Sequence, residues 1–147
     1  MIPLLLCNSC GDEGCTESRN SYTVATIRQD TVNSATAIRM LSVFGIGQKN
    51  DSAMVEATNS LQSVSLILNP DTSFTKMEFV FTLDLDTVID TLSFYYRNEA
   101  YFISIDCGCS VHNYIDSVLH TNHLIQQVEI INPEITNEKK TNIAIHY

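Results

Sequence analysis

Apolar and polar residues alternate along most of the chain, with the period of two that is typical of β-strands. The alternation is clearest in segment 76–85, where one face carries only apolar side chains (Met77, Phe79, Phe81, Leu83 and Leu85). The opposite face is mostly polar (Lys76, Glu78, Thr82 and Asp84). A strand with one buried and one solvated face belongs to an antiparallel sheet. The pattern therefore predicts an antiparallel strand over 76–85.

The same alternation predicts further strands at 21–29, 37–45, 63–69, 127–132 and 142–147. A β-hairpin is also predicted, because alternating residues 92–97 and 101–107 flank Asn98-Glu99, whose residue types favour a turn. Cys107 is then expected on the inward face, at the end of the returning strand.

Segment 110–120 departs from the period of two. Its apolar residues recur with the spacing of one helix face (Val111, Tyr114, Ile115, Val118 and Leu119). We therefore expect a short helix over 110–120 that crosses one end of the sheets.

The chain has 147 residues, enough for one domain with a core of its own. About seven short strands separated by turn residues, without intervening helices, are typical of a β-sandwich. We predict a mainly β protein: a single antiparallel, immunoglobulin-like β-sandwich over 21–147 with one short helix. Residues 1–20 are expected to be the remnant of a signal sequence and a tether.

The N-terminus has the order of residues found at the end of a bacterial lipoprotein signal. An apolar run, Ile2–Leu6, is followed by Ser9, then by Cys10, and then by acidic residues. We expect Cys10 to be lipidated and the protein to be exported and anchored in the cell envelope, on the periplasmic or surface face of the outer membrane. No Lys or Arg precedes Arg19, so the basic start of such a signal would lie upstream of Met1. The alternative is an apolar N-terminus of a soluble protein.

The formal net charge is −9, from 17 acidic and 8 basic residues. Such a surface repels phosphate backbones, which argues against nucleic-acid binding. No run approaches the roughly 18 apolar residues that cross a bilayer. The expected partners are therefore the membrane, through the lipid anchor, and another envelope protein.

Cysteine usage predicts one disulfide. With Cys10 acylated and the preceding residues removed, three cysteines remain, and we expect Cys15 to pair with Cys107 and to leave Cys109 free. The competing pair is Cys15–Cys109.

Several residue clusters are candidates for metal binding. In a reducing compartment, a zinc site could form from Cys7, Cys10, Cys107, Cys109 and His112. The carboxylates of Asp84, Asp86 and Asp90 superficially match a calcium loop, but the glycine of the sharp turn and the closing glutamate are missing. His120 and His123 supply only half of a metal site. We therefore expect neither a metal nor a cofactor.

No catalytic motif is present: the chain lacks G-x-S-x-G, HExxH and a glycine-rich phosphate loop. We predict a non-enzymatic structural or binding module of the envelope. The alternative is a small thiol enzyme that uses Cys109 with His112. The aromatic residues Tyr95, Tyr96, Tyr101 and Phe102 cluster in sequence, and an exposed Tyr95 and Phe102 could form a binding patch.

The C-terminal half resembles a family of small predicted lipoproteins from Bacteroidetes that is classified only as a domain of unknown function. The resemblance is carried by four segments: Asp90–Arg97, Ile105–Gly108, Ile131–Thr136 and Asn142–Tyr147. The early cysteine that follows the lipidated one in that family corresponds to Cys15 here. The resemblance implies export and an anchored β-domain, and it implies no activity.

Overall fold

The protein is described from a computed structural model, which covers residues 15, 20–30, 37–47, 53–58 and 62–147. These residues form ten strands and no helix. The strands are β1 (Thr23–Arg28), β2 (Met40–Gly45), β3 (Ala53–Thr58), β4 (Ser63–Leu66), β5 (Phe74–Thr82), β6 (Thr87–Ser104), β7 (Gly108–His120), β8 (Gln127–Ile130), β9 (Glu134–Ile135) and β10 (Thr141–His146). No helix with the length and apolarity needed to cross a membrane occurs in this part of the chain.

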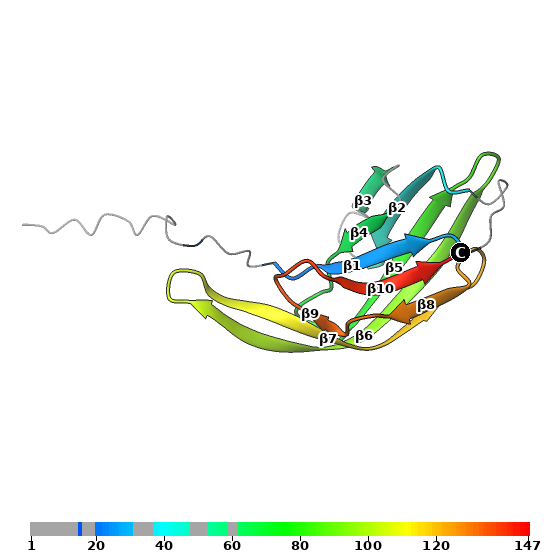
Figure 1. Cartoon of the computed structure of the whole chain (residues 1–147). Helices are drawn as coiled ribbons and strands as arrows, with labels where there is room; N and C mark the ends of the chain where they lie inside the picture. Colours follow the sequence, from blue (N-terminus) through cyan, green and yellow to red (C-terminus); the bar gives the residue numbers. More distant parts are fainter. Residues whose placement is uncertain (1–14, 16–19, 31–36, 48–52, 59–61) are drawn as a thin grey trace, which may run out of the picture.

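The strands form two sheets (Figure 1). One has four strands in the order β4-β1-β10-β8, and the other has six in the order β3-β2-β5-β6-β7-β9. Every described strand pair is antiparallel except β1–β10, which is parallel from Val24↔Thr141 to Arg28↔His146. The expectation of a wholly antiparallel arrangement is therefore wrong at this pair. The mainly β class is confirmed, and the immunoglobulin-like assignment stays a prediction.

The hydrophobic core lies between the two sheets. The four-stranded sheet contributes apolar side chains such as Ile27, Leu66 and Ile143, and the six-stranded sheet contributes a larger set that includes Phe79 and Phe94. Strand β5 has the predicted alternation, since its inward residues are buried and its outward residues are more accessible. The core thus follows from the period-two pattern of the sequence.

Strands β6 and β7 form a hairpin that is much longer than the rest of the sheet. They pair from Leu92↔His120 to Ser104↔Gly108. The half of the hairpin farther from the body, residues 98–113, extends beyond the other strands (Figure 1); we call it the arm. The turn at its end is followed directly by Gly108, whose positive φ of 73° is a backbone conformation that favours glycine. We call residues 101–107 the tip of the arm.

The helix predicted over 110–120 is wrong, because these residues belong to strand β7. A β-bulge explains the misleading spacing: Tyr95 faces Ser117 while Tyr96 faces Ile115, so that Asp116 is an extra residue. The bulge shifts the inward positions by one, so Ile115 and Val118 both contact the core although they are three residues apart.

Two predicted strand ends are also displaced. Strand β6 runs through Asn98-Glu99 without a turn, and the chain reverses at Ile105–Cys107 instead. Strand β5 ends at Thr82, so that Leu85 lies in the β5–β6 turn, 97% exposed, rather than inside.

Candidate functional site: the arm and its disulfide

The turn of the arm is covalently joined to the N-terminal segment of the protein. Cys15 and Cys107 form a disulfide with their Cα atoms 4.8 Å apart, across a sequence separation of 92 residues. Cys107 is buried, whereas Cys109 is exposed and free. The sequence favoured this pair over Cys15–Cys109. The predicted acceptor Cys10 lies outside the described residues, as does Cys7.

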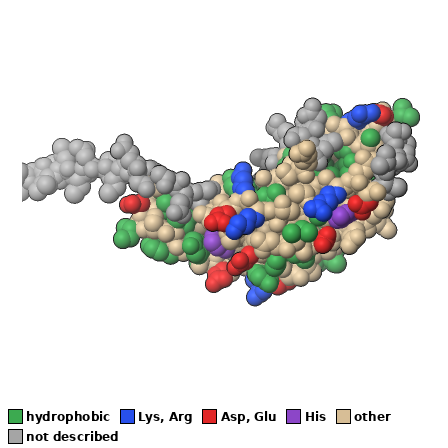
Figure 2. Space-filling view, in the orientation of Figure 1, with side chains coloured by type: hydrophobic (Ala, Val, Ile, Leu, Met, Phe, Trp, Pro, Cys, Tyr) green, Lys and Arg blue, Asp and Glu red, His purple; other side chains and the backbone are tan. Residues whose placement is uncertain are grey.

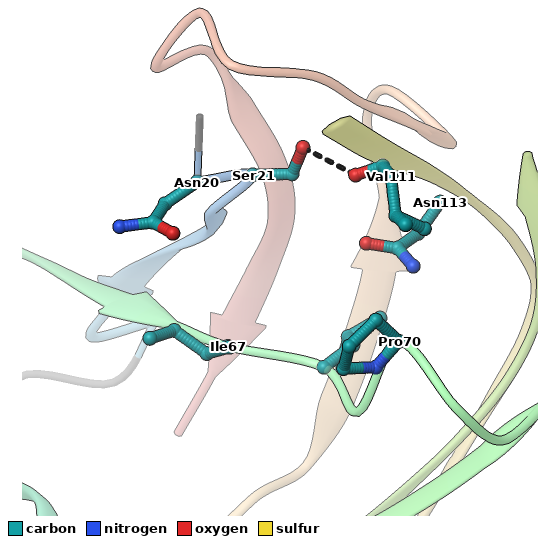
Figure 3. Close-up of a pocket in the computed structure, with 7 residues that line it drawn as sticks. Asn20, Ser21, Ile67, Pro70, Val111 and Asn113 are labelled. Carbon is teal, nitrogen blue, oxygen red and sulfur yellow. Dashed lines mark hydrogen bonds between the residues drawn. The ribbon is translucent and has the colours of Figure 1, made fainter. Parts of the chain in front are cut away.

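The chain that leads into β1 also contacts the base of the arm. The hydroxyl of Ser21 donates a hydrogen bond to the backbone carbonyl of Val111, at 2.7 Å. Figure 3 shows this contact beside a hollow of ≈ 170 Å³, which Ile67 and Pro70 line from the β4–β5 connection. A hollow of this size is below the roughly 300–1,000 Å³ of small-molecule sites. We interpret it as a packing crevice at the base of the arm.

A closed ring of hydrogen bonds holds the β4–β5 connection against β6. The Tyr96 hydroxyl donates to the carbonyl of Asn69 at 2.8 Å and lies 2.6 Å from the hydroxyl of Thr75. The Thr75 hydroxyl in turn accepts from the backbone N–H of Asn69, at 3.2 Å. Because Tyr96 is buried, each polar atom in the ring needs the partner it has.

Asn98 continues this attachment onto the arm. Its side-chain amide donates to the carbonyls of Pro70 and Thr72, at 3.0 and 2.6 Å. Its side-chain oxygen accepts from the amide of Asn113 at 2.6 Å. The residue predicted to make a turn therefore fixes both strands of the arm to the body.

A buried carboxylate, Asp90, organises the connection from β7 to β8. It is fully buried, and it accepts hydrogen bonds from the Thr121 hydroxyl at 2.6 Å and from backbone N–H groups of residues 123–125 at 2.7–2.9 Å. His123 Nδ1 lies 3.0 Å from the same carboxylate. Burial by itself raises the pKa of Asp90, but the hydrogen bonds from Thr121 and the backbone outweigh it and lower the pKa to about 2.

Asp90 was considered only as a calcium ligand in the sequence. Its structural role could have been found there, because the inward alternation of Leu92, Phe94 and Tyr96 extends back to position 90. Asp84, by contrast, pairs with Arg39 at 2.6 Å on the surface, and Asp86 lies in the exposed β5–β6 turn. The three carboxylates therefore do not converge on one site.

The outer face of the arm base carries a shallow, charged hollow of ≈ 330 Å³, lined in part by Glu99, His112 and Glu134. Arg97 lies over the ring of Tyr114, 4.6 Å from its centroid, and pairs with Asp116 at 3.1 Å. The Arg97 guanidinium is thus already engaged by neighbouring side chains.

Cys109 and His112 do not form a catalytic pair. Cys109 faces Phe102 and His112 faces Glu99 in an uninterrupted stretch of register. Positions three apart on a strand point to opposite faces of the sheet. The imidazole instead stacks on Tyr101, with ring centroids 4.2 Å apart. His112 is therefore not positioned to accept a proton from the Cys109 thiol.

The other metal candidates are separated as well. Cys107, which belonged to the zinc hypothesis, is held in the disulfide. His120 Nδ1 lies 2.7 Å from the carbonyl of Thr121, while His123 contacts Asp90. Among the residues that the structure describes, no three His, Cys, Asp or Glu side chains are grouped so that they could hold a metal ion.

The aromatic cluster of the sequence does not form one patch. Tyr96 is buried, and Tyr95 packs on Phe74 with ring centroids 5.0 Å apart. Alternation along β6 places Tyr95 and Phe102 on opposite faces of the sheet. The exposed aromatic side chains are therefore divided between the sheet surface and the tip of the arm.

Comparison with known families identifies residues 40–147 as a match to DUF6452, a family of unknown function. The chain belongs to this family. The DUF6452 match begins at β2 and includes the whole arm with Cys107, whereas β1 and Cys15 precede it. The expected membership of a family of unknown function is thus confirmed, and the match carries no statement about lipidation or source organism. No curated protein and no solved structure matches the chain significantly.

Proposed function

We propose that this protein is an exported lipoprotein, anchored in the cell envelope through Cys10, and that its β-domain is a structural or binding module rather than an enzyme. The Cys15–Cys107 disulfide is the observation that supports export most directly. Disulfides form and persist in oxidising compartments such as the bacterial periplasm and the cell surface, and they are rare in the cytosol.

The sequence before the disulfide supports the anchor. The apolar run, the small Ser9, Cys10 and the acidic residues after it follow the order of a lipoprotein signal junction. One acyl chain gives only marginal membrane binding, so stable attachment requires several acyl chains on Cys10. The N-terminal segment would then tether the domain to the membrane.

The arrangement of the reactive side chains favours a non-enzymatic role. Cys109 and His112 point to opposite faces of β7. The buried Asp90 already accepts hydrogen bonds from the β7–β8 connection. A nucleophile needs a base within hydrogen-bond reach and a group that orients this base. None of the described candidates has this arrangement.

Metabolic labelling tests the anchor. Cells that produce the protein are grown with a clickable palmitate, and wild type is compared with Cys10→Ala and with the matched control Cys7→Ala. We expect label in wild type and in Cys7→Ala and none in Cys10→Ala. Equal labelling of wild type and Cys10→Ala, or no label in either, would contradict the proposal.

A further inference from the structure

The tip of the arm exposes apolar side chains to solvent. Ile105 is 93% exposed, Phe102 60% and Tyr101 46%. Figure 2 shows hydrophobic side chains gathered at the end of the molecule where the arm protrudes. Tyr101 and Phe102 are adjacent on β6, so they point to opposite faces of the hairpin. Packing one face of the arm against a surface would therefore cover only one of them.

The disulfide brings this tip close to the proposed lipid anchor. Five positions separate Cys10 from Cys15, and Cys15 is bonded to Cys107 in the turn of the arm. Five residues span at most about 17 Å. Without the disulfide the connection from Cys10 to β1 is thirteen positions long, and such a segment spans up to about 45 Å. The bond thus restricts the tip, rather than the body, to the neighbourhood of the bilayer.

The charges of the arm indicate which membrane surface fits. Residues 98–113 contain no Lys or Arg, and Asp106 is exposed beside Ile105. Attraction to anionic lipids depends on Lys and Arg near the surface, and the arm itself offers neither. The composition of the arm instead permits its apolar side chains to insert into the surface of a membrane made of zwitterionic lipids.

The backbone of the turn limits how deep the tip can go. The N–H of Cys107 is satisfied by the Ser104 hydroxyl at 3.0 Å, but the end of a hairpin still presents backbone groups that need water or headgroups. Tyrosine, which the tip carries at position 101, is enriched at this interfacial level of membranes. The tip is therefore suited to the interfacial region and not to the hydrocarbon centre.

We propose that the tip of the arm, residues 101–107, inserts into the interfacial region of the zwitterionic bilayer that holds the lipid anchor. The inference rests on the proposed anchoring through Cys10. With the anchor and the tip both in contact with the membrane, the arm is directed toward the bilayer. The β5–β6 turn, which contains Leu85, lies at the opposite end of the molecule (Figure 1).

The chain contains no tryptophan, which allows a direct test. Ile105→Trp and the control Leu85→Trp each introduce one fluorophore at a highly exposed apolar position, at opposite ends of the domain. The acylated proteins are reconstituted into phosphatidylcholine vesicles with and without brominated acyl chains. For Ile105→Trp we expect emission at shorter wavelength and quenching by the brominated lipid, and for Leu85→Trp neither effect.

Mass spectrometry of the same samples separates the two proposals. Acylated protein without quenching in Ile105→Trp overturns the inference and leaves the anchor intact, while unacylated protein overturns the anchor itself. Adding Cys15→Ser to Ile105→Trp lengthens the connection, so quenching is expected to decrease. An emission shift that depends on protein concentration and is not accompanied by quenching from brominated lipid would show that the tip contacts a second copy of the chain. That result would overturn the proposal.

Discussion

The hydroxyl of Thr121 links two strands of the long hairpin through the buried Asp90. It donates to the Asp90 carboxylate at 2.6 Å and accepts from the backbone N–H of Thr91 at 2.8 Å. The N–H of Thr121 completes the link by donating to the carbonyl of Thr91, at 3.1 Å. The carboxylate then receives the first backbone N–H groups of the chain that crosses from β7 to β8. The Asp90 side chain thus fixes the segment that leads from β7, in the six-stranded sheet, to β8, in the four-stranded sheet.

Replacing Asp90 by Asn should destabilise the protein. An amide nitrogen at one of the two oxygen positions would face backbone N–H donors and leave them without an acceptor. We expect the free energy of unfolding to fall by about 2–4 kcal/mol, measured by urea denaturation. Asp86→Asn, in the exposed β5–β6 turn, is the matched control and should change it much less. Equal midpoints for the two variants would contradict the structural role of Asp90.

Acid should destabilise the protein through the same carboxyl. The pKa of Asp90 is about 2 in the folded protein, against its ordinary value of 3.8. Because the folded-state pKa is depressed, the stabilisation is present above about pH 4 and is lost as the pH falls toward 2. The lowered pKa corresponds to roughly 2 kcal/mol. Between pH 5 and pH 2 the free energy of unfolding should fall less steeply in Asp90→Asn than in wild type. Parallel curves for the two proteins would show that another group causes the acid destabilisation.

Removing the Tyr96 hydroxyl should loosen the β4–β5 connection. Tyr96→Phe leaves the carbonyl of Asn69 and the hydroxyl of Thr75 without their partner in a buried position. We expect a loss of about 1–3 kcal/mol in thermal or urea unfolding. Tyr95→Phe alters the neighbouring, partly exposed ring and should stay within about 0.5 kcal/mol of wild type. The prediction fails if the two variants unfold alike.

Removing the disulfide should lower stability without abolishing the two sheets. A bond that closes a loop of 92 residues restricts the unfolded chain, and such bonds typically contribute about 2–4 kcal/mol. The double variant Cys15→Ser/Cys107→Ser should therefore unfold at lower urea concentration than the oxidised wild type. Cys109→Ser removes a free, exposed thiol and is expected to unfold like wild type. A double variant as stable as wild type would show that the bond does not restrict the unfolded chain.

Local patterning predicted much of the strand content. The period of two located β5 and its inward residues Met77, Phe79 and Phe81, because one face of that strand packs on the core. It also located β1, β2, β4, β8 and β10 to within a few residues. The pair Cys15–Cys107 was predicted from the placement of the cysteines together with the expected acylation of Cys10, which left three cysteines.

The sequence could not determine features that depend on contacts between distant residues. The bulge at Asp116 mimics helical spacing, because an extra residue in one strand shifts the inward positions only when a partner strand defines the register. Asn98 has the chemistry of a turn residue, but the carbonyls of Pro70 and Thr72 bind its amide and β6 continues.

The sequence by itself determined that the chain forms two-faced strands around one apolar core, since the alternation of apolar and polar side chains is a local property of each strand. Only the tertiary structure decided which strands are neighbours. Alternation is the same in parallel and antiparallel partners, so the parallel pairing of β1 with β10 left no local signal. The exposure of Phe102 and Ile105 was likewise decided by the tertiary structure, because it depends on the arm extending beyond the sheet that would otherwise cover it.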